Sequence, residues 1–142
     1  MPYENELIYS TVARAGIRLA FESPKQLLDA VFKNRQVVAT VDLPCHLNMI
    51  VNQYSEHQLT LQNIIYRHTL FPIYAPFVPE ARRKQCIKWM GNISQGSVHL
   101  SLGINASRVP IIDRLRYCPQ CLKEQAFQKG EFYWLSLWQI QG

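Results

Sequence analysis

Acidic residues are scarce in this chain, and their scarcity argues against several kinds of enzyme site. Ten Asp and Glu stand against fifteen Lys and Arg in 142 residues, which gives a formal net charge of +5. The acidic residues are scattered singly, so the sequence does not suggest the clustered carboxylates of a metal-dependent nuclease. A Gly-rich phosphate loop, a GxSxG nucleophile turn and an HExxH helix are also missing. We therefore expect a protein that is not an enzyme, and a nuclease, the enzymatic alternative, has no motif in its favour.

Long apolar runs and cysteines are also few. No stretch of about 18 apolar residues could cross a membrane, and no secretory signal opens the chain. We therefore expect a cytoplasmic protein in a reducing compartment, with no membrane partner. Of the four cysteines, Cys45 and Cys86 lie in helix-like apolar contexts that are typical of free buried thiols. Apolar residues crowd positions 132–140, and domains rarely stop on such a segment, so we expect the natural chain to continue.

Apolar residues recur at helical spacing through much of the first 112 residues. One face of a helix predicted over residues 5–21 gathers Ile8, Val12, Ala15 and Leu19, and another carries Arg14 and Arg18. A second helix is predicted to begin at Ser23, a good N-cap, followed by Pro24 at the first helical position. Further helices are predicted over residues 47–54, 60–68 and 79–90, the last ending at Gly91. The sequence thus predicts a mainly α-helical domain over residues 1–112.

Four segments depart from this periodicity. Residues 36–41 are β-branched and predict a short strand or an extended link. Residues 71–79 contain three prolines, so we expect an extended segment across the bundle. Residues 98–102 alternate, which fits a strand, although a short helix is equally compatible. Residues 105–113 are predicted to form a loop.

The segment 114–122 (RLRYCPQCL) carries the sharpest chemical motif. Cys118 and Cys121 are separated by two residues, so two thiolates can bind one tetrahedral zinc ion. A helix predicted over residues 121–128, ending at Gly130, would complete half of a zinc-ribbon or treble-clef-like site. Structural zinc takes four ligands, and His99, a third candidate, is more typical of a satisfied core histidine. Residues 113–142 are therefore interpreted as a truncated zinc-knuckle segment. A redox CxxC and a pair of plain buried thiols are the alternatives.

Two basic clusters are candidates for contacts with DNA phosphates. One comprises Arg82, Arg83, Lys84 and Lys88, and the other comprises Arg114 and Arg116, with Arg108 nearby. Phosphate contacts need only positive charge and reach, so the signal is unspecific and a solvated helix face explains the first cluster equally well. No recognition helix is obvious, although the helix pairs of the first 70 residues could contain one.

Several motifs in order along the chain resemble the TniQ family, and in particular its TnsD branch. They are residues 2–10 (PYENELIYS), 13–14 (AR), 23–28 (SPKQLL), 42–44 (DLP) with 46–47 (HL), 68–72 (HTLFP), 115–122 (LRYCPQCL) and 130–134 (GEFYW). The resemblance extends over nearly the whole chain, and the ordered set is far more specific than any one motif.

The resemblance implies a role in target-site selection during DNA transposition. Such proteins recognise a target, directly through DNA or on an RNA-guided complex, and recruit an AAA+ ATPase regulator that brings the transposase. Their N-terminal region generally engages the ATPase, and we expect a bacterial, nucleoid-associated protein. Family members carry a second ligand pair, a Cys and a His, after the aromatic segment, and that pair is missing from these residues. The competing interpretation is a sequence-specific DNA-binding regulator with a zinc knuckle and no ATPase partner.

Overall fold

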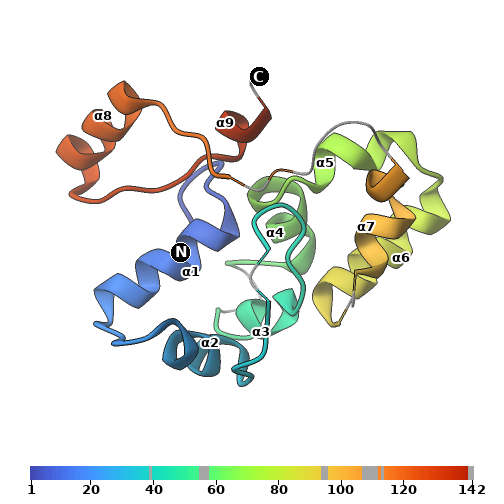
Figure 1. Cartoon of the computed structure of the whole chain (residues 1–142), viewed down its shortest axis with the longest axis horizontal. Helices are drawn as coiled ribbons and strands as arrows, with labels where there is room; N and C mark the ends of the chain where they lie inside the picture. The colour runs from blue at the N-terminus through green and yellow to red at the C-terminus, as the bar shows by residue number, and fades with distance from the viewer. Residues whose placement is uncertain (39, 55–57, 94–95, 107–111, 113, 141–142) are drawn as a thin grey trace.

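The computed structural model describes residues 1–38, 40–54, 58–93, 96–106, 112 and 114–140, most of which are helical (Figure 1). The longer helices are α1 (Ile8–Arg18), α2 (Pro24–Phe32), α4 (Leu61–His68), α6 (Glu80–Gly91) and α8 (Pro119–Lys129). The shorter segments are α3 (Leu47–Val51), α5 (Phe71–Tyr74), η1 (Ala75–Phe77), α7 (Ser97–Ser101), η2 (Ile104–Ala106) and α9 (Ser136–Ile140). In these ranges the β pairing is limited to one isolated antiparallel bridge, between Glu6 and Leu135. The predicted mainly α-helical fold is confirmed.

Side-chain caps fix the beginnings of two helices. The hydroxyl of Ser23 accepts a hydrogen bond from the backbone N–H of Gln26 at 3.3 Å, and Pro24 follows at the first helical position. At α4, the hydroxyl of Thr60 accepts from the N–H of Asn63 at 3.2 Å. Each cap satisfies an N–H group that has no partner within its helix. The predicted start of α2 at Ser23 is therefore confirmed.

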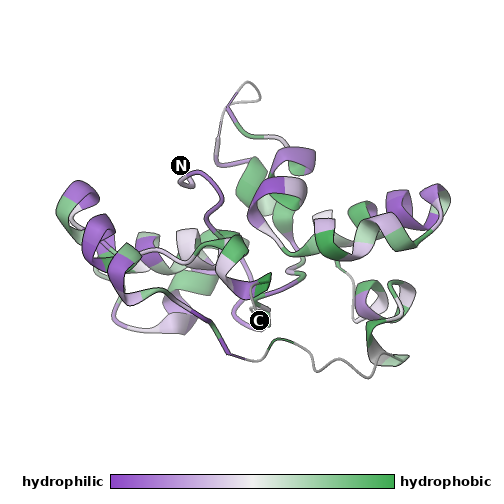
Figure 2. Cartoon of the chain, turned by 90° about the horizontal axis from the view of Figure 1, so that it is seen from above, coloured by the Kyte–Doolittle hydropathy of each residue, from purple (hydrophilic) through white to green (hydrophobic). Residues whose placement is uncertain are grey.

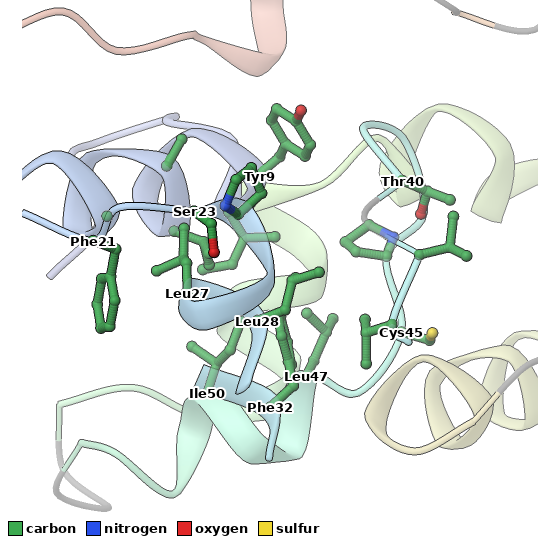
Figure 3. A pocket seen from close by; sticks show the side chains of 18 of the residues that line it. Tyr9, Phe21, Ser23, Leu27, Leu28, Phe32, Thr40, Cys45, Leu47 and Ile50 are labelled. Atoms are coloured by element: carbon green, nitrogen blue, oxygen red, sulfur yellow. The ribbon is translucent and has the colours of Figure 1, made fainter. Parts of the chain in front are cut away.

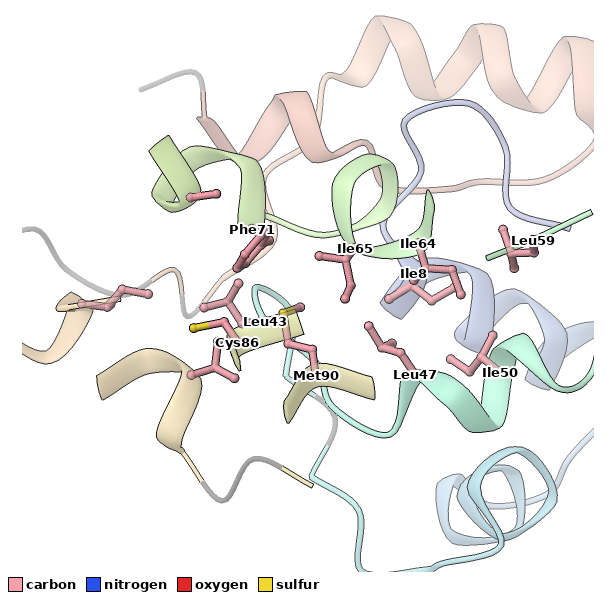
Figure 4. Packing of buried hydrophobic residues seen from close by; sticks show 13 residues of the cluster. Ile8, Leu43, Leu47, Ile50, Leu59, Ile64, Ile65, Phe71, Cys86 and Met90 are labelled. Carbon is pink, nitrogen blue, oxygen red and sulfur yellow. The ribbon is translucent and has the colours of Figure 1, made fainter. Parts of the chain in front are cut away.

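One apolar cluster joins α1 to the central helices (Figure 4). Its buried members are Ile8, Leu43, Leu47, Ile50, Leu59, Ile64, Ile65, Phe71, Ala75, Cys86, Met90, Val98 and Ile104. They come from α1, α3, α4, α5, η1, α6, α7 and η2 and from the intervening segments, so the core draws on residues 8–104. Figure 2 shows hydrophobic residues where these helices meet and hydrophilic residues on many of their outer sides.

The three prolines of residues 71–79 each stand at the start of a helical segment. Pro72 lies in the first turn of α5, Pro76 lies in the first turn of η1, and Pro79 is the N-cap of α6. In these positions a proline loses no intrahelical hydrogen bond, because the first N–H groups have no acceptor in the helix. The predicted extended segment is wrong for this reason: it is a chain of short helical turns.

The other departures from the predicted elements are smaller. The first helix ends at Arg18, because Ala20 adopts a left-handed φ of 52°, and Leu19 is exposed instead of facing the core. Residues 98–102, for which strand and helix were both open, lie in α7 and its C-cap. The described part of residues 36–41 forms no strand, and most of the predicted loop at 105–113 lies outside the described residues.

The helix α6 ends at Gly91 as predicted, but the glycine is not needed there for its backbone freedom. Its φ is not in the left-handed region that favours glycine at a helix end. A Cβ atom there would lie 2.9 Å from the side-chain amide nitrogen of Asn48 and 2.9 Å from a methyl carbon of Leu61. The glycine therefore permits the close approach of α6 to α3 and α4.

Candidate functional site

The two cysteines of the CxxC motif meet at the start of α8. Cys118 is the N-cap residue, Pro119 follows at the first helical position, and the carbonyl of Cys118 accepts the N–H of Leu122 at 3.0 Å. The two thiols lie close enough in this turn to influence each other's pKa. Both side chains are half-buried. The turn thus brings the two sulfurs close together, as a metal-binding CxxC turn does.

The hydrogen bonds in this turn separate the acidities of the two thiols. The backbone N–H of Cys121, followed by its thiol, lowers the pKa of Cys118 because both donate toward its sulfur. The hydrogen bond with Cys118 in turn raises the pKa of Cys121. Cys118 is therefore the sulfur that more readily becomes a thiolate, the form that binds metal.

Two sulfurs supply only half of a tetrahedral zinc site. Among the described residues, no group of three or more His, Cys, Asp or Glu side chains is placed to hold one metal ion. His99 contacts Asp42 instead, with its Nε2 atom 2.7 Å from the carboxylate. Cys86 is buried in the core and Cys45 lines the groove described below. The residues fit the first ligand pair of a zinc ion, and the described part of the chain does not contain the second.

A polar seam fastens the segment after α8 to the start of the chain. Its centre is Glu6, fully buried, whose carboxylate accepts from the guanidinium Nε and Nη2 of Arg14 at 2.8 Å each and from the hydroxyl of Ser10 at 2.7 Å. Arg14 also donates to Glu131 at 2.7 Å, and Glu131 is further bound by Arg18. The hydrogen bond from Arg18 lowers the pKa of Glu131. Each buried charge in the seam is thus paired.

Backbone hydrogen bonds extend the same seam. The N–H of Leu7 donates to the carbonyl of Trp134 at 2.8 Å, and the N–H of Ser136 donates to the carbonyl of Asn5 at 2.9 Å. Tyr3 packs against Tyr133, with ring centroids 4.6 Å apart and the ring planes tilted by 39°. Residues 131–136 therefore lie along residues 3–7, and this segment connects α8 to the start of α1 (Figure 1).

Sequence reasoning missed the seam, although its residues fall within motifs that it singled out. Arg14 and Arg18 were recognised as one turn apart, and Glu131 belongs to the GEFYW motif. The signal was the presence of charged residues in both motifs. Nothing local indicated that the two motifs, 117 residues apart at Arg14 and Glu131, would meet. The predicted boundary between residues 1–112 and 113–142 stays a prediction.

The predicted phosphate contacts lie on separate elements. Arg82, Arg83, Lys84 and Lys88 all belong to α6, where Lys84 pairs with Glu80 at 2.8 Å and Arg83 is half-buried. Arg114 and Arg116 precede α8, and both are exposed. The backbone of Arg116 is fixed by the side-chain amide of Gln139, with hydrogen bonds of 2.9 and 3.0 Å. Arg108 lies outside the described residues. The roles of these side chains in DNA binding stay predictions.

An apolar groove of about 430 Å³ opens between α1, α2 and residues 37–45 (Figure 3). Its lining is aliphatic and aromatic with few polar groups, and it includes Ile8, Tyr9, Val12, Ala13, Ile17, Phe21, Leu27, Leu28, Phe32, Val37, Val38, Pro44, Cys45 and Leu47. Gly16 lets the two helices meet, because a Cβ there would lie 2.8 Å from a methyl carbon of Leu27. The sequence predicted both helices but not the groove between them.

The match to known proteins covers the whole length of the chain. A family model described as TniQ matches residues 1–142. The chain therefore belongs to the TniQ family. It is 50% identical over 141 residues to the transposon Tn7 transposition protein TnsD of Escherichia coli. The alignment covers 99% of this chain and 28% of TnsD, so the chain spans well under a third of that relative. No helix in the described ranges is both long and apolar enough to span a membrane.

Proposed function

We propose that this chain acts in target-site selection during DNA transposition and recruits an AAA+ ATPase regulator to target DNA. The observation that carries the proposal is the 50% identity to TnsD across 99% of the chain. The ordered motifs, from the opening PYENELIYS to GEFYW, support it. The protein is proposed to act by binding, without catalysis of its own, and a transposase complex or an RNA-guided complex would complete the assembly.

The recruiting role is tested by a pull-down of the protein with the AAA+ ATPase encoded beside it, in the presence of ATP and DNA. Retention of the ATPase is the expected result. Failure of a folded protein to retain it would contradict the recruiting role. Binding to a single DNA site without any need for the ATPase would favour the sequence-specific regulator instead.

We further propose that Cys118 and Cys121 are the first ligand pair of a structural zinc site. The convergence of the two sulfurs at the start of α8 supports this assignment. Bound zinc would tie α8 to the segment that supplies the remaining ligands, and its binding would contribute to folding. Cys118, whose pKa is lowered within this turn, would bind as the thiolate.

Metal analysis of the full-length protein tests this assignment. Cys118→Ser is expected to lose the zinc that the unsubstituted protein carries, and Cys45→Ser, far from the CxxC turn in sequence, is the matched control. Equal zinc content in the two variants, or a full-length protein that folds without metal, would contradict the site.

The basic residues of α6 and those before α8 are proposed to contact DNA phosphates. Neutralising one such contact reduces the slope of log affinity against log salt by about 0.9. We therefore expect Lys88→Gln and Arg114→Gln each to flatten the salt dependence of DNA binding. Arg67→Gln, an exposed cation on α4, is the control that should leave the slope unchanged. An unchanged slope in both test variants would leave these residues as solvated surface charges.

A further inference from the structure

Two buried glutamines fix the segments on either side of α8. Gln125 of α8 is 5% exposed, and its Oε1 atom accepts a hydrogen bond from the backbone N–H of Tyr133 at 3.1 Å. Gln139 of α9 is 3% exposed and contacts Arg116, two residues before the CxxC turn. Residues 114–140, all of them described, contribute no side chain to the main buried apolar cluster. Each buried amide needs polar partners, because an unmatched polar group in the interior is costly.

Gln139 binds the backbone of Arg116 with both ends of its amide. Its Oε1 atom accepts from the N–H of Arg116 at 2.9 Å, and its Nε2 atom donates to the carbonyl of Arg116 at 3.0 Å. The same Nε2 atom also donates to the carbonyl of Leu135 at 3.1 Å. An amide has one oxygen and two N–H donors, so the whole group is used. The backbone of Arg116 is thus held as it would be by a neighbouring antiparallel strand, although Arg116 lies outside any helix.

The amide of Gln139 projects from a helix that is itself fixed. The backbone N–H of Ser136, the first residue of α9, donates to the carbonyl of Asn5 at 2.9 Å, and its hydroxyl donates to the same carbonyl at 3.2 Å. Gln139 follows three residues later in the same helix. The position of α9 is therefore set by the start of the chain, and Gln139 passes it on to the segment before the CxxC turn.

An amide of this length is needed for all three contacts of Gln139. Methionine nearly matches the shape of glutamine but has no N–H donor and only a weak acceptor. Glutamate keeps an oxygen for the N–H of Arg116, but it places a second oxygen against the carbonyls of Arg116 and Leu135, to which Nε2 now donates. Either substitution would therefore release the backbone of Arg116 without removing the bulk of the side chain.

A fixed backbone at Arg116 matters for a side chain that binds DNA. Arg116 is exposed, and its guanidinium is proposed above to contact a DNA phosphate. Ordering a flexible backbone residue during binding reduces affinity, so a cation that is positioned beforehand binds more tightly. Gln139 is too deeply buried to touch DNA itself. It can affect DNA binding only through the segment that it holds.

From these contacts we infer that Gln139 is a positioning residue for DNA binding: its amide fixes the backbone of Arg116 and thereby presents the guanidinium to a DNA phosphate. The inference rests on the proposed phosphate contact of Arg116 and deepens it, because it assigns a role to a residue that does not reach the DNA. The effects of Gln139 and Arg116 on DNA affinity are therefore coupled, whereas those of Gln139 and Lys88, on α6, are independent.

The test measures the affinity of the whole chain for a fluorescent DNA duplex by anisotropy. The sequence of the duplex is arbitrary, because phosphate contacts carry no sequence information. Gln139→Met is expected to weaken binding about fivefold, the lower end of the cost of ordering one backbone residue. Gln128→Met, at an exposed glutamine on α8, is the matched control and should bind normally. Hydrogen exchange of the Arg116 N–H should become faster in Gln139→Met and stay unchanged in Gln128→Met.

Double variants separate positioning from a general effect on the fold. Arg116→Gln should weaken DNA binding, and the addition of Gln139→Met to it should cause little further loss. The addition of Gln139→Met to Lys88→Gln should still weaken binding about fivefold. Urea unfolding checks that each variant is folded, and if Gln139→Met is not, Gln139→Glu takes its place in the same comparison.

Equal losses from Gln139→Met in the Arg116→Gln and Lys88→Gln backgrounds would overturn the inference, because Gln139 would then act only on the fold. That outcome would leave the phosphate contact of Arg116 intact. If Arg116→Gln bound the duplex as well as the unsubstituted chain, the phosphate contact itself would be contradicted, and the inference would fall with it. None of these outcomes bears on recruitment of the ATPase.

Discussion

The apolar core and the polar seam fasten their elements by different physical means. Around Met90, the helices are held by hydrocarbon packing that is non-directional and tolerant of small shifts. Around Glu6, the ends of the chain are held by directional hydrogen bonds between buried charges, with Arg14 in contact with two carboxylates. Burying charges is costly unless each is paired, so the seam is stable only as a complete set. Small substitutions in the core should therefore lower the unfolding free energy only gradually. Loss of a single charged partner in the seam should instead cause a large loss of unfolding free energy at once.

Removal of Arg14 is expected to give the largest effect. Arg14→Leu would leave the carboxylate of Glu6, 0% exposed, without its counter-charge, which should cost about 3–5 kcal/mol of unfolding free energy. Urea denaturation measures the loss. The control is Arg35→Leu, whose ion pair with Asp29 is exposed and should contribute less than about 1 kcal/mol.

The double variant Glu6→Leu with Arg14→Leu should be less destabilised than Arg14→Leu alone, because no unpaired charge remains at Glu6. If Arg14→Leu and Arg35→Leu lost similar amounts of stability, the seam would have no special role.

Truncation of a buried side chain in the core is expected to give the next largest loss of stability. Met90→Ala, at a fully buried side chain, should lose about 2–5 kcal/mol of unfolding free energy by creating a cavity. Met90→Leu should lose less than about 1.5 kcal/mol, because the volume is nearly kept. In the seam, by contrast, a substitution that nearly keeps the side-chain volume should still be strongly destabilising. If Met90→Leu and Met90→Ala lost similar amounts of stability in thermal or urea unfolding, the core would be no more tolerant of substitution than the seam.

The smallest expected effect concerns pH at α7. The hydrogen bond to Asp42 raises the pKa of His99, so its stabilising contribution is complete below the unfolded value of about 6.5 and declines as pH rises through the folded value. The stability difference between the unsubstituted chain and His99→Gln should therefore shrink by about 1 kcal/mol at high pH, as a charged hydrogen bond becomes a neutral one.

Urea unfolding at about pH 5.5 and about pH 9 measures this change. Burial lowers the pKa of His68, which gives the opposite trend with pH, but both proteins retain that histidine and its contribution cancels. A difference that stays constant between the two pH values would show that His99 is not charged against Asp42.

The parts of the fold that depend on neighbours in sequence could be predicted, and those that depend on distant partners could not. The caps at Ser23 and Thr60 act within three residues, and the apolar periodicity of α1 and α4 is local too. The CxxC turn was found for the same reason, since its contacts lie within residues 118–122. Its missing ligands and its connection to the start of the chain depend on contacts that no short pattern encodes.

Residues 71–79 show a different kind of error. The prolines there were interpreted as excluding helix, because each was considered as an interior residue. In the structure each lies at the start of a helical segment, where proline is tolerated. The positions of the helix starts, rather than the number of prolines, decide the conformation, and those positions are set by packing around Phe71 and Ala75.

The seam also constrains the order in which the protein can be made. Arg14 leaves the ribosome long before Glu131, which follows 117 residues later. During synthesis, Glu6 and Arg14 are therefore without their distant partners until those residues have been made. The main buried apolar cluster lies within residues 8–104 and can collapse first, since domains fold as their segments emerge. Residues 131–136 then dock along residues 3–7, so the first residues of the chain are fixed only after residue 136 has been made.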